Sequence, residues 1–328
     1  MKNRGKLNYV EFSAALVIVS STMATLKVFG HKAPDTDTTC CAVIWAWYLN
    51  EHKKMPAIPY MLGEPNKETS FVLNYWKVKQ PALLESVAKG DEVVIVDTNN
   101  PQELFENLSD ATIVEIVDHH KLSGLMTAAP LTMTIRPLAS TASVMYDMMG
   151  AVAESLPKEM AGLILSCILS DTLEFRSPTT TPHDKEIAEK LGKQLGVDIP
   201  KYATEMFAAK SDVSDYSDVG LIHIDSKKFE VGGKNIRISV VETTTPDSIL
   251  KRKAGIVAAF KEVMAEDKSD DVLFFVIDIL KEEATVFAYN DFTKSIVEKS
   301  FGVKVSGDTA VLPGVVSRKK QIVPVLKI

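Results

Sequence analysis

Three short, β-branched apolar stretches, each followed by side chains that can bind a metal, constrain this 328-residue chain most strongly. They run from Leu26 to Gly30, from Val93 to Val96 and from Thr112 to Val117. Helical patterns lie between and after them, and this alternation predicts strands of a parallel α/β sheet. The carboxyl ends of such strands meet at one edge, where open α/β sheets bind their ligands. We therefore expect the polar residues that follow these strands to share one site.

The residues at the three strand ends combine imidazole and carboxylate groups: His31, Asp35, Asp37, Asp97, Asp118, His119 and His120. A simpler role exists for single acids, since Asp35 or Asp37 could cap the following helix and an acid after a strand is common in turns. Three strand ends that all deliver Asp or His favour a metal site. The nitrogen donors shift the preference from Mg²⁺ towards a transition metal such as Mn²⁺.

Two further features point to chemistry. Asp171 follows an apolar helical stretch, a costly place for an acid unless it caps the helix, pairs with a cation or binds metal. Near the C-terminus, the run from Ser317 to Gln321 contains three consecutive basic residues between apolar segments that resemble buried strands. A short basic run is usually a solvated surface. Its apolar flanks here favour a phosphate-binding site instead.

The composition favours a globular protein and argues against some classes of binding protein. Apolar residues make up 46% of the chain and charged residues 24%, which allows large buried cores. A net charge of −6 argues against a protein that coats nucleic acid or an anionic membrane. The cysteines do not form a disulfide framework, and a reducing compartment is the simpler interpretation. We expect a cytoplasmic protein.

The chain is predicted to contain two α/β domains. A polar, aperiodic segment at 211–218 is the predicted linker, which gives domains at 25–210 and 219–328. Residues 1–24 form a separate N-terminal extension, which is either dispensable, with Met23 as the natural start, or an export or targeting segment.

The motifs together resemble one family. The sequence contains GHKAPDTD from Gly30, VD at Asp97, VDHH ending at His120, LSDT around Asp171 and SRKKQ from Ser317. In this order they resemble the family II, manganese-dependent inorganic pyrophosphatases of the DHH phosphoesterase superfamily. The resemblance implies an N-terminal DHH domain with a mainly parallel sheet flanked by helices. It also implies a smaller C-terminal domain of DHHA2 type with a mixed sheet, which binds substrate.

The resemblance also implies roles for individual residues. His31 and Asp35 would bind one Mn²⁺ ion and Asp37 and His119 a second, while Asp97 and Asp171 would bind both and hold a bridging hydroxide. Asp118 would orient the motif. The residues implied to bind substrate are His120, Lys227, Arg318 and Lys319. Co²⁺ is the alternative metal, and further Mg²⁺ or Mn²⁺ would arrive with the substrate.

The implied function is hydrolysis of inorganic pyrophosphate to two phosphates, in a homodimer formed through the first domain. Metal ions that share a water molecule lower its pKa and aim it at phosphorus. The alternatives are a short-chain exopolyphosphatase of the same superfamily and a non-catalytic module that senses metal or phosphate. One departure from the family pattern is Thr98, where a His is common, and we expect it to affect the surroundings of the metal site.

Overall fold

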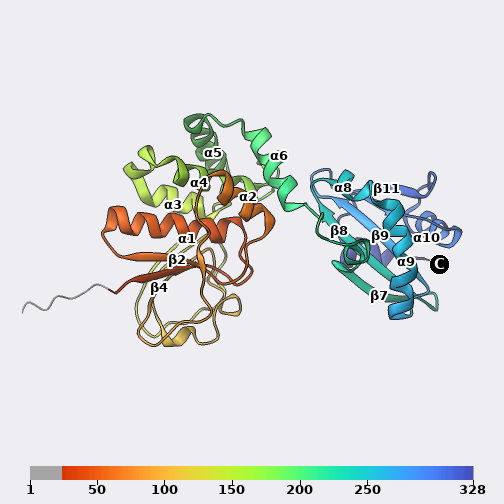
Figure 1. Cartoon of the computed structure of the whole chain (residues 1–328), viewed down its shortest axis with the longest axis horizontal. Helices are drawn as coiled ribbons and strands as arrows, with labels where there is room; N and C mark the ends of the chain where they lie inside the picture. Colours follow the sequence, from red (N-terminus) through yellow and green to blue (C-terminus); the bar gives the residue numbers. More distant parts are fainter. Residues whose placement is uncertain (1–23, 328) are drawn as a thin grey trace, which may run out of the picture.

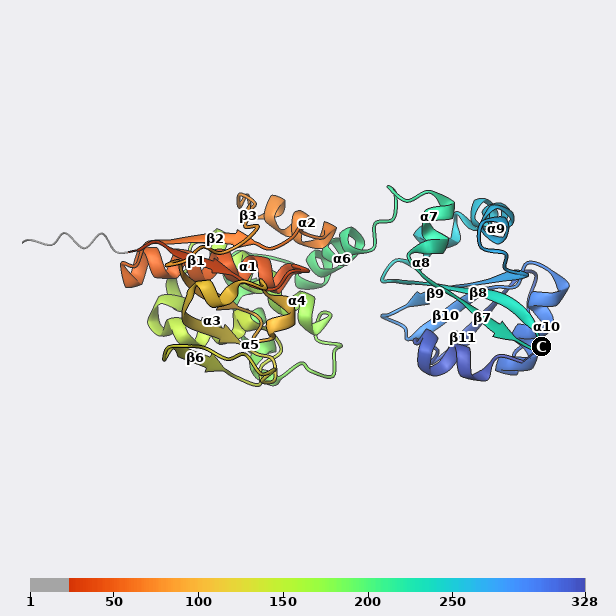
Figure 2. The same cartoon turned by 90° about the horizontal axis from the view of Figure 1, so that it is seen from below.

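The computed structural model describes residues 24–327, which fold around two separate β-sheets (Figure 1). The extension predicted at 1–24 therefore lies outside the described residues, apart from its last residue. The two sheet regions lie side by side along the longest axis, joined by the segment after α6 (Figure 2). An α/β chain with two sheets confirms the predicted fold class.

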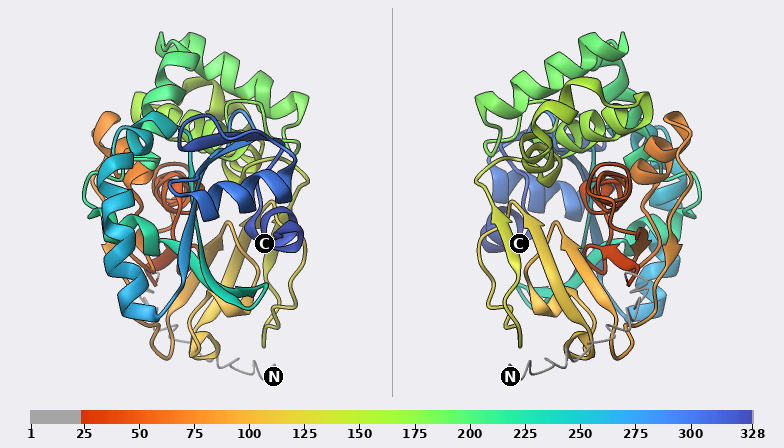
Figure 3. Two further views of the ribbon diagram at one scale, coloured as in Figure 1. Left: turned by 90° about the vertical axis from the view of Figure 1, so that its right-hand side faces the viewer. Right: turned by 90° about the vertical axis from the view of Figure 1, so that its left-hand side faces the viewer.

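The first sheet has six strands, all parallel, in the order β3-β2-β1-β4-β5-β6. Figure 3 shows it face on in the right-hand view. Its strands are β1 (Leu26–Phe29), β2 (Ala57–Met61), β3 (Ala82–Leu83), β4 (Glu92–Val96), β5 (Thr112–Asp118) and β6 (Thr132–Ile135). The helices of this domain are α1 (Thr36–Tyr48), α2 (Lys67–Tyr75), α3 (Thr141–Met149), α4 (Lys158–Thr172), α5 (Pro182–Leu195) and α6 (Ile199–Lys210).

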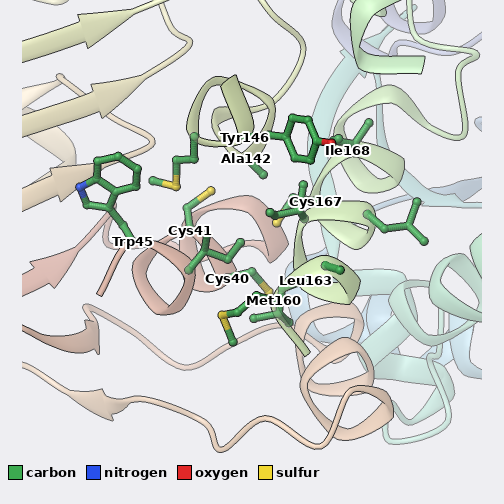
Figure 4. Packing of buried hydrophobic residues seen from close by; sticks show 14 of the residues in the cluster. Cys40, Cys41, Trp45, Ala142, Tyr146, Met160, Leu163, Cys167 and Ile168 are labelled. Atoms are coloured by element: carbon green, nitrogen blue, oxygen red, sulfur yellow. The ribbon is translucent and has the colours of Figure 1, made fainter. Parts of the chain in front are cut away.

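The core of the first domain is centred on the packing of α1 against α4. The helices meet through small and medium side chains, including Cys40 and Cys41 of α1 and Cys167 and Ile168 of α4, all fully buried (Figure 4). The turn from β1 into α1 requires Gly30. A Cβ there would lie 2.6 Å from Thr38 Cγ2 and 2.7 Å from the Val96 carbonyl oxygen. This close approach places the start of α1 directly over the end of β4.

The second sheet has five strands in the order β11-β10-β9-β8-β7, of which only β8 and β9 pair in parallel. The strands are β7 (Asp225–Val231), β8 (Lys234–Thr243), β9 (Asp271–Asp278), β10 (Glu283–Phe287) and β11 (Thr309–Pro313). The helices are α7 (Asp218–His223), α8 (Pro246–Leu250), α9 (Lys253–Asp267) and α10 (Asp291–Phe301). Apolar clusters cover both faces of this sheet, so the central strand β9 is buried along its whole length.

One local prediction is wrong. The basic run near the C-terminus does not lie between two strands, because only β11 precedes it. Arg318–Ile322 form a π-helical turn and Val323–Val325 a 3₁₀ turn. The apolar residues after the run pack as a helical turn through Ile322, which is fully buried. A short apolar run fits a strand or a buried turn equally well.

Candidate metal centre

The predicted metal ligands of the first domain gather at one edge of its sheet. His31 and Asp35 follow β1, Asp97 follows β4 and His119 follows β5. Asp37 lies in the first turn of α1 and Asp171 in the last turn of α4, rather than after that helix as the sequence suggested. Because β1, β4 and β5 are parallel neighbours, their carboxyl ends and the start of α1 converge here.

Asp97 lies at the centre of this group and has an unusual backbone conformation. Its φ angle is +60°, in the left-handed region, and its side chain is buried. Such a conformation costs about 1–3 kcal/mol in a non-glycine residue and is typical of functional sites. Its carboxylate accepts hydrogen bonds from the hydroxyls of Thr38 and, at 2.9 Å, Thr141. Both oxygens are thus fixed in place.

His31 and Asp35 form one side of the centre. The Nε2 atom of His31 lies 3.7 Å from Asp35 Oδ2 and 3.6 Å from Asp97 Oδ2. Burial alone would lower the pKa of His31, but hydrogen bonds to the two carboxylates raise it to about 10. Asp35 also caps α1, since its Oδ1 accepts from the Thr38 amide at 2.9 Å. Capping and metal binding are therefore compatible, because they use different oxygens.

Asp37, His119 and Asp171 form the other side. Asp37 accepts from the Ser140 hydroxyl and the Thr141 amide, both at 2.7 Å, at the N-terminus of α3. His119 donates from Nδ1 to the Leu138 carbonyl at 2.9 Å, which directs Nε2 to within 3.5 Å of Asp97 Oδ1.

The carboxyls at the middle of the centre resist ionisation in the metal-free protein. Burial, together with the charges of Asp37 and Asp97, raises the pKa of Asp171 well above its usual range. Burial and the Asp37 charge likewise raise the pKa of Asp97 to about 7. Asp171 Oδ2 is buried and has no hydrogen-bond partner. A cation would complete the bonding of this oxygen and relieve the repulsion among the acids.

The candidate ligand atoms form two groups of three, each close enough together to bind one metal ion. Those of His31, Asp35 and Asp97 lie within 4.8 Å of one another, and so do those of Asp37, His119 and Asp171. Imidazole nitrogen and carboxylate oxygen donors, with one buried oxygen of Asp171 unsatisfied, fit a divalent transition ion.

Asp118 and His120 extend the centre outwards. Asp118 Oδ1 accepts from His120 Nδ1 at 2.9 Å and from the His119 amide at 2.7 Å. The hydrogen bond to Asp118 raises the pKa of His120 to about 9. His120 is half exposed and lines a cavity of about 390 Å³ together with Asp35, Asp97, His119 and Asp171. The imidazole thus stands at the open side of the centre.

Sequence reasoning missed several supporting residues. Asn99 donates to Asp118 Oδ2 at 2.6 Å, and its Oδ1 accepts from the Ser123 amide at 2.6 Å. Thr98, by contrast, is bonded to residues other than the proposed ligands: its hydroxyl donates to Glu103 at 2.7 Å and accepts from the Asn100 amide at 3.1 Å. Thr38 and Thr141, which donate to Asp97, were also missed. The polar residues at the starts of α1 and α3 were the sequence signal that could have indicated them.

The predicted phosphate-binding cations lie in the second domain and away from the centre (Figure 1). Arg318 is mostly buried and pairs with Asp225 of β7 at 2.7 Å, while its Nη1 is buried without a partner. Lys227 lies two residues after Asp225, on the same face of β7. Lys319 and Lys227 are exposed. Within residues 24–327, no hydrogen bond or ion pair joins these cations to the ligands of the first domain.

Comparison with known proteins identifies the class of this chain. Residues 25–168 match the model of the DHH family N-terminal domain, and residues 204–328 match the DHHA2 domain.

Two similar proteins, which match nearly the whole chain, identify the family within this class. The chain is 38% identical over 306 residues to the manganese-dependent inorganic pyrophosphatase of Bacillus subtilis, covering 93% of this chain and 98% of that protein. A crystal structure of a putative family II inorganic pyrophosphatase from Methanococcus jannaschii is 36% identical, with a TM-score of 0.59, and covers 91% of this chain and 97% of that one. The chain belongs to the family of manganese-dependent inorganic pyrophosphatases, which are hydrolases.

A membrane-spanning helix is not found within residues 24–327, where every helix is too short or too polar to cross a bilayer.

Proposed function

We propose that this chain hydrolyses inorganic pyrophosphate at two divalent metal ions bound in the first domain, with the substrate held between the two domains. The observation that carries the proposal is the convergence of six nitrogen and oxygen ligands on one sheet edge, with an unsatisfied buried oxygen at Asp171. The names of the relatives, which specify manganese and pyrophosphate, agree with this chemistry.

His31 and Asp35 would hold one ion, and Asp37 and His119 the other. Asp97 and Asp171 would contact both. Two such ions supply a water molecule of lowered pKa as nucleophile and neutralise the phosphate charge. Mn²⁺ suits the mixed donor set, Co²⁺ is the alternative, and additional Mg²⁺ or Mn²⁺ would enter with the substrate.

Residues of the chain would bind and orient the substrate. His120 is fixed through Nδ1 by Asp118, which leaves Nε2 for a phosphate oxygen at the open side of the centre. The raised pKa of this imidazole favours its charged form, which binds phosphate more strongly.

The second domain would supply cations for the leaving phosphate. Arg318 has an unpartnered Nη1, and Lys319 and Lys227 have exposed ammonium groups. Since these groups lie away from the first domain here, the domains must close around the substrate. The segment at 211–218 connects them and would act as the hinge.

The proposal includes a homodimer formed through the first domain. β6 lies at the edge of the six-stranded sheet, where a second copy could pair with it. Light scattering coupled to gel filtration tests this: a monomeric mass would contradict it.

Phosphate release tests the activity itself. Metal-stripped protein is given pyrophosphate or tripolyphosphate, each with Mn²⁺, with Mg²⁺ and without added metal. We expect fast release from pyrophosphate, favoured by Mn²⁺. Release mainly from tripolyphosphate would indicate a polyphosphatase with the same site. No release from either would indicate a non-catalytic module.

A further inference from the structure

A buried glutamate in the first turn of α2 lies between the metal centre and the segment that joins the domains. Glu68 is fully buried. Its Oε2 accepts from Lys210 Nζ at 3.0 Å, from Ser170 Oγ at 3.0 Å and from Thr36 Oγ1 at 3.3 Å. Its Oε1 is buried without a partner. A buried carboxylate is costly unless it is paired, so removing one partner has a large effect.

Two partners of Glu68 are chain neighbours of the metal ligands. Ser170 directly precedes Asp171 in α4, and Thr36 lies between Asp35 and Asp37 at the start of α1. One carboxylate oxygen therefore joins the two helices that carry three of the proposed ligands. Groups that hold ligands in place typically change metal affinity about 10–100-fold when they are removed.

The third partner belongs to the interdomain connection. Lys210 is the last residue of α6, and the next residue, Ser211, is buried and bonded to Thr244 of the second domain through its hydroxyl. Beside Glu68, Lys67 pairs with Asp212 at 3.1 Å and with Asp215 at 2.6 Å. Helices α2 and α6 lie side by side in both views (Figures 1 and 2). The start of α2 thus contacts the interdomain connection through the pair of buried Glu68 with Lys210 and through two exposed pairs of Lys67.

We propose that Glu68 is a positioning residue that couples the hinge to the metal ligands through its ion pair with Lys210. Because Ser211 is bonded to Thr244, a movement of the second domain that displaces Ser211 also displaces the adjoining Lys210. Through Glu68, this displacement shifts Ser170 and Thr36 against each other. Domain closure and the arrangement of Asp35, Asp37 and Asp171 are then linked, and the linkage acts in both directions. This inference rests on the proposed function, because it assigns these carboxylates to metal.

The test is a double-mutant cycle on the full chain with Glu68→Gln, Lys210→Gln and both together. Mn²⁺ affinity is measured by calorimetry on metal-stripped protein, and kcat and KM for pyrophosphate are measured at saturating Mn²⁺. Each single change removes the same ion pair. We expect about tenfold weaker Mn²⁺ binding in each single variant and no further loss in the double variant. We also expect kcat to fall more than KM rises.

Glu154→Gln is the matched control, since Glu154 forms its exposed pair with Lys190 of α5 rather than with α6 or the segment at 211–218. This change should leave all three quantities unchanged. The proposal is overturned if the two single effects multiply in the double variant. It is equally overturned if Glu68→Gln lowers only the melting temperature. If Glu68→Gln does not fold, Lys210→Gln decides alone, because that side chain is partly exposed. The Mn²⁺ affinities test the coupling even if pyrophosphate is not the substrate.

Discussion

The two groups of residues assigned to this chemistry are built in opposite ways. The proposed metal ligands of the first domain come from three adjacent strand ends and two packed helices, and Asp37, Asp97 and His119 are held by hydrogen bonds. The cations of the second domain lie on an edge strand and a single helical turn, and two of the three are exposed. Under the proposed function, metal binding would be a fixed property of the first domain, whereas substrate binding would be completed by movement of the second.

The largest effect is expected at the most constrained residue of the first group. Asp97→Asn keeps the size of the side chain and its tolerance of positive φ but removes the charge at the middle of the centre. We expect both Mn²⁺ affinity and kcat to fall by more than about 100-fold, beyond the range for outer hydrogen-bond partners. Calorimetry and phosphate release measure the two quantities. Retained Mn²⁺ binding would show that Asp97 is not a ligand.

A smaller effect is expected at Asn99, which holds Asp118 beside the proposed metal ligands through a hydrogen bond. Asn99→Ala removes the donor to Asp118 and leaves that buried carboxylate with fewer partners. We expect kcat/KM to fall about tenfold, mostly through misplacement of His120. Gln102→Ala, on a more exposed neighbour, serves as the control. Equal effects of the two substitutions would show that the Asn99 contact has no special role.

The second group should respond in KM rather than in metal affinity. Lys227→Ala removes an exposed ammonium group from β7, so we expect KM for pyrophosphate to rise about fivefold to tenfold while Mn²⁺ affinity stays unchanged. Lys228→Ala, on the opposite face of the strand, is the control. If both variants behaved alike, the effect would be one of net charge only.

The sequence predicts features that depend on a local pattern, and it does not predict features that depend on contacts between distant residues. His31, Asp97 and His119 were predictable because each lies within two residues of the end of an apolar strand, which is a local pattern. Thr141 and Glu68 were not, because each acts through contacts with residues far along the chain. The turn after Arg318 was mistaken for a strand because a short apolar run does not reveal its own period.

A modest effect of pH on stability is expected in the metal-free protein. The folded state raises the pKa of Asp97 from 3.8 to about 7, and that of His31 from 6.5 to about 10. Between the unfolded and folded pKa of each group, the folded state therefore binds more protons than the unfolded state. The free energy of unfolding decreases as pH rises through each of these ranges. For Asp97 this loss occurs between about pH 4 and 7, and for His31 between about pH 6.5 and 10.

Calorimetric melting checks this sign. We expect the melting temperature without metal to fall by a few degrees between about pH 6 and about pH 9. Saturating Mn²⁺ should remove most of the decrease, because binding requires deprotonated ligands. A melting temperature that rises over this range would contradict the crowding of acids described for the centre.

The most direct test of the division between the domains is one double variant, Arg318→Ala with Lys319→Ala, measured for Mn²⁺ affinity and for kcat/KM on pyrophosphate. Lys320→Ala, an exposed neighbour in the same turn, is the matched control. We expect Mn²⁺ affinity within about twofold of the unmodified protein and a fall in kcat/KM of about 100-fold or more. A parallel loss of Mn²⁺ affinity, or an unchanged kcat/KM, would contradict it.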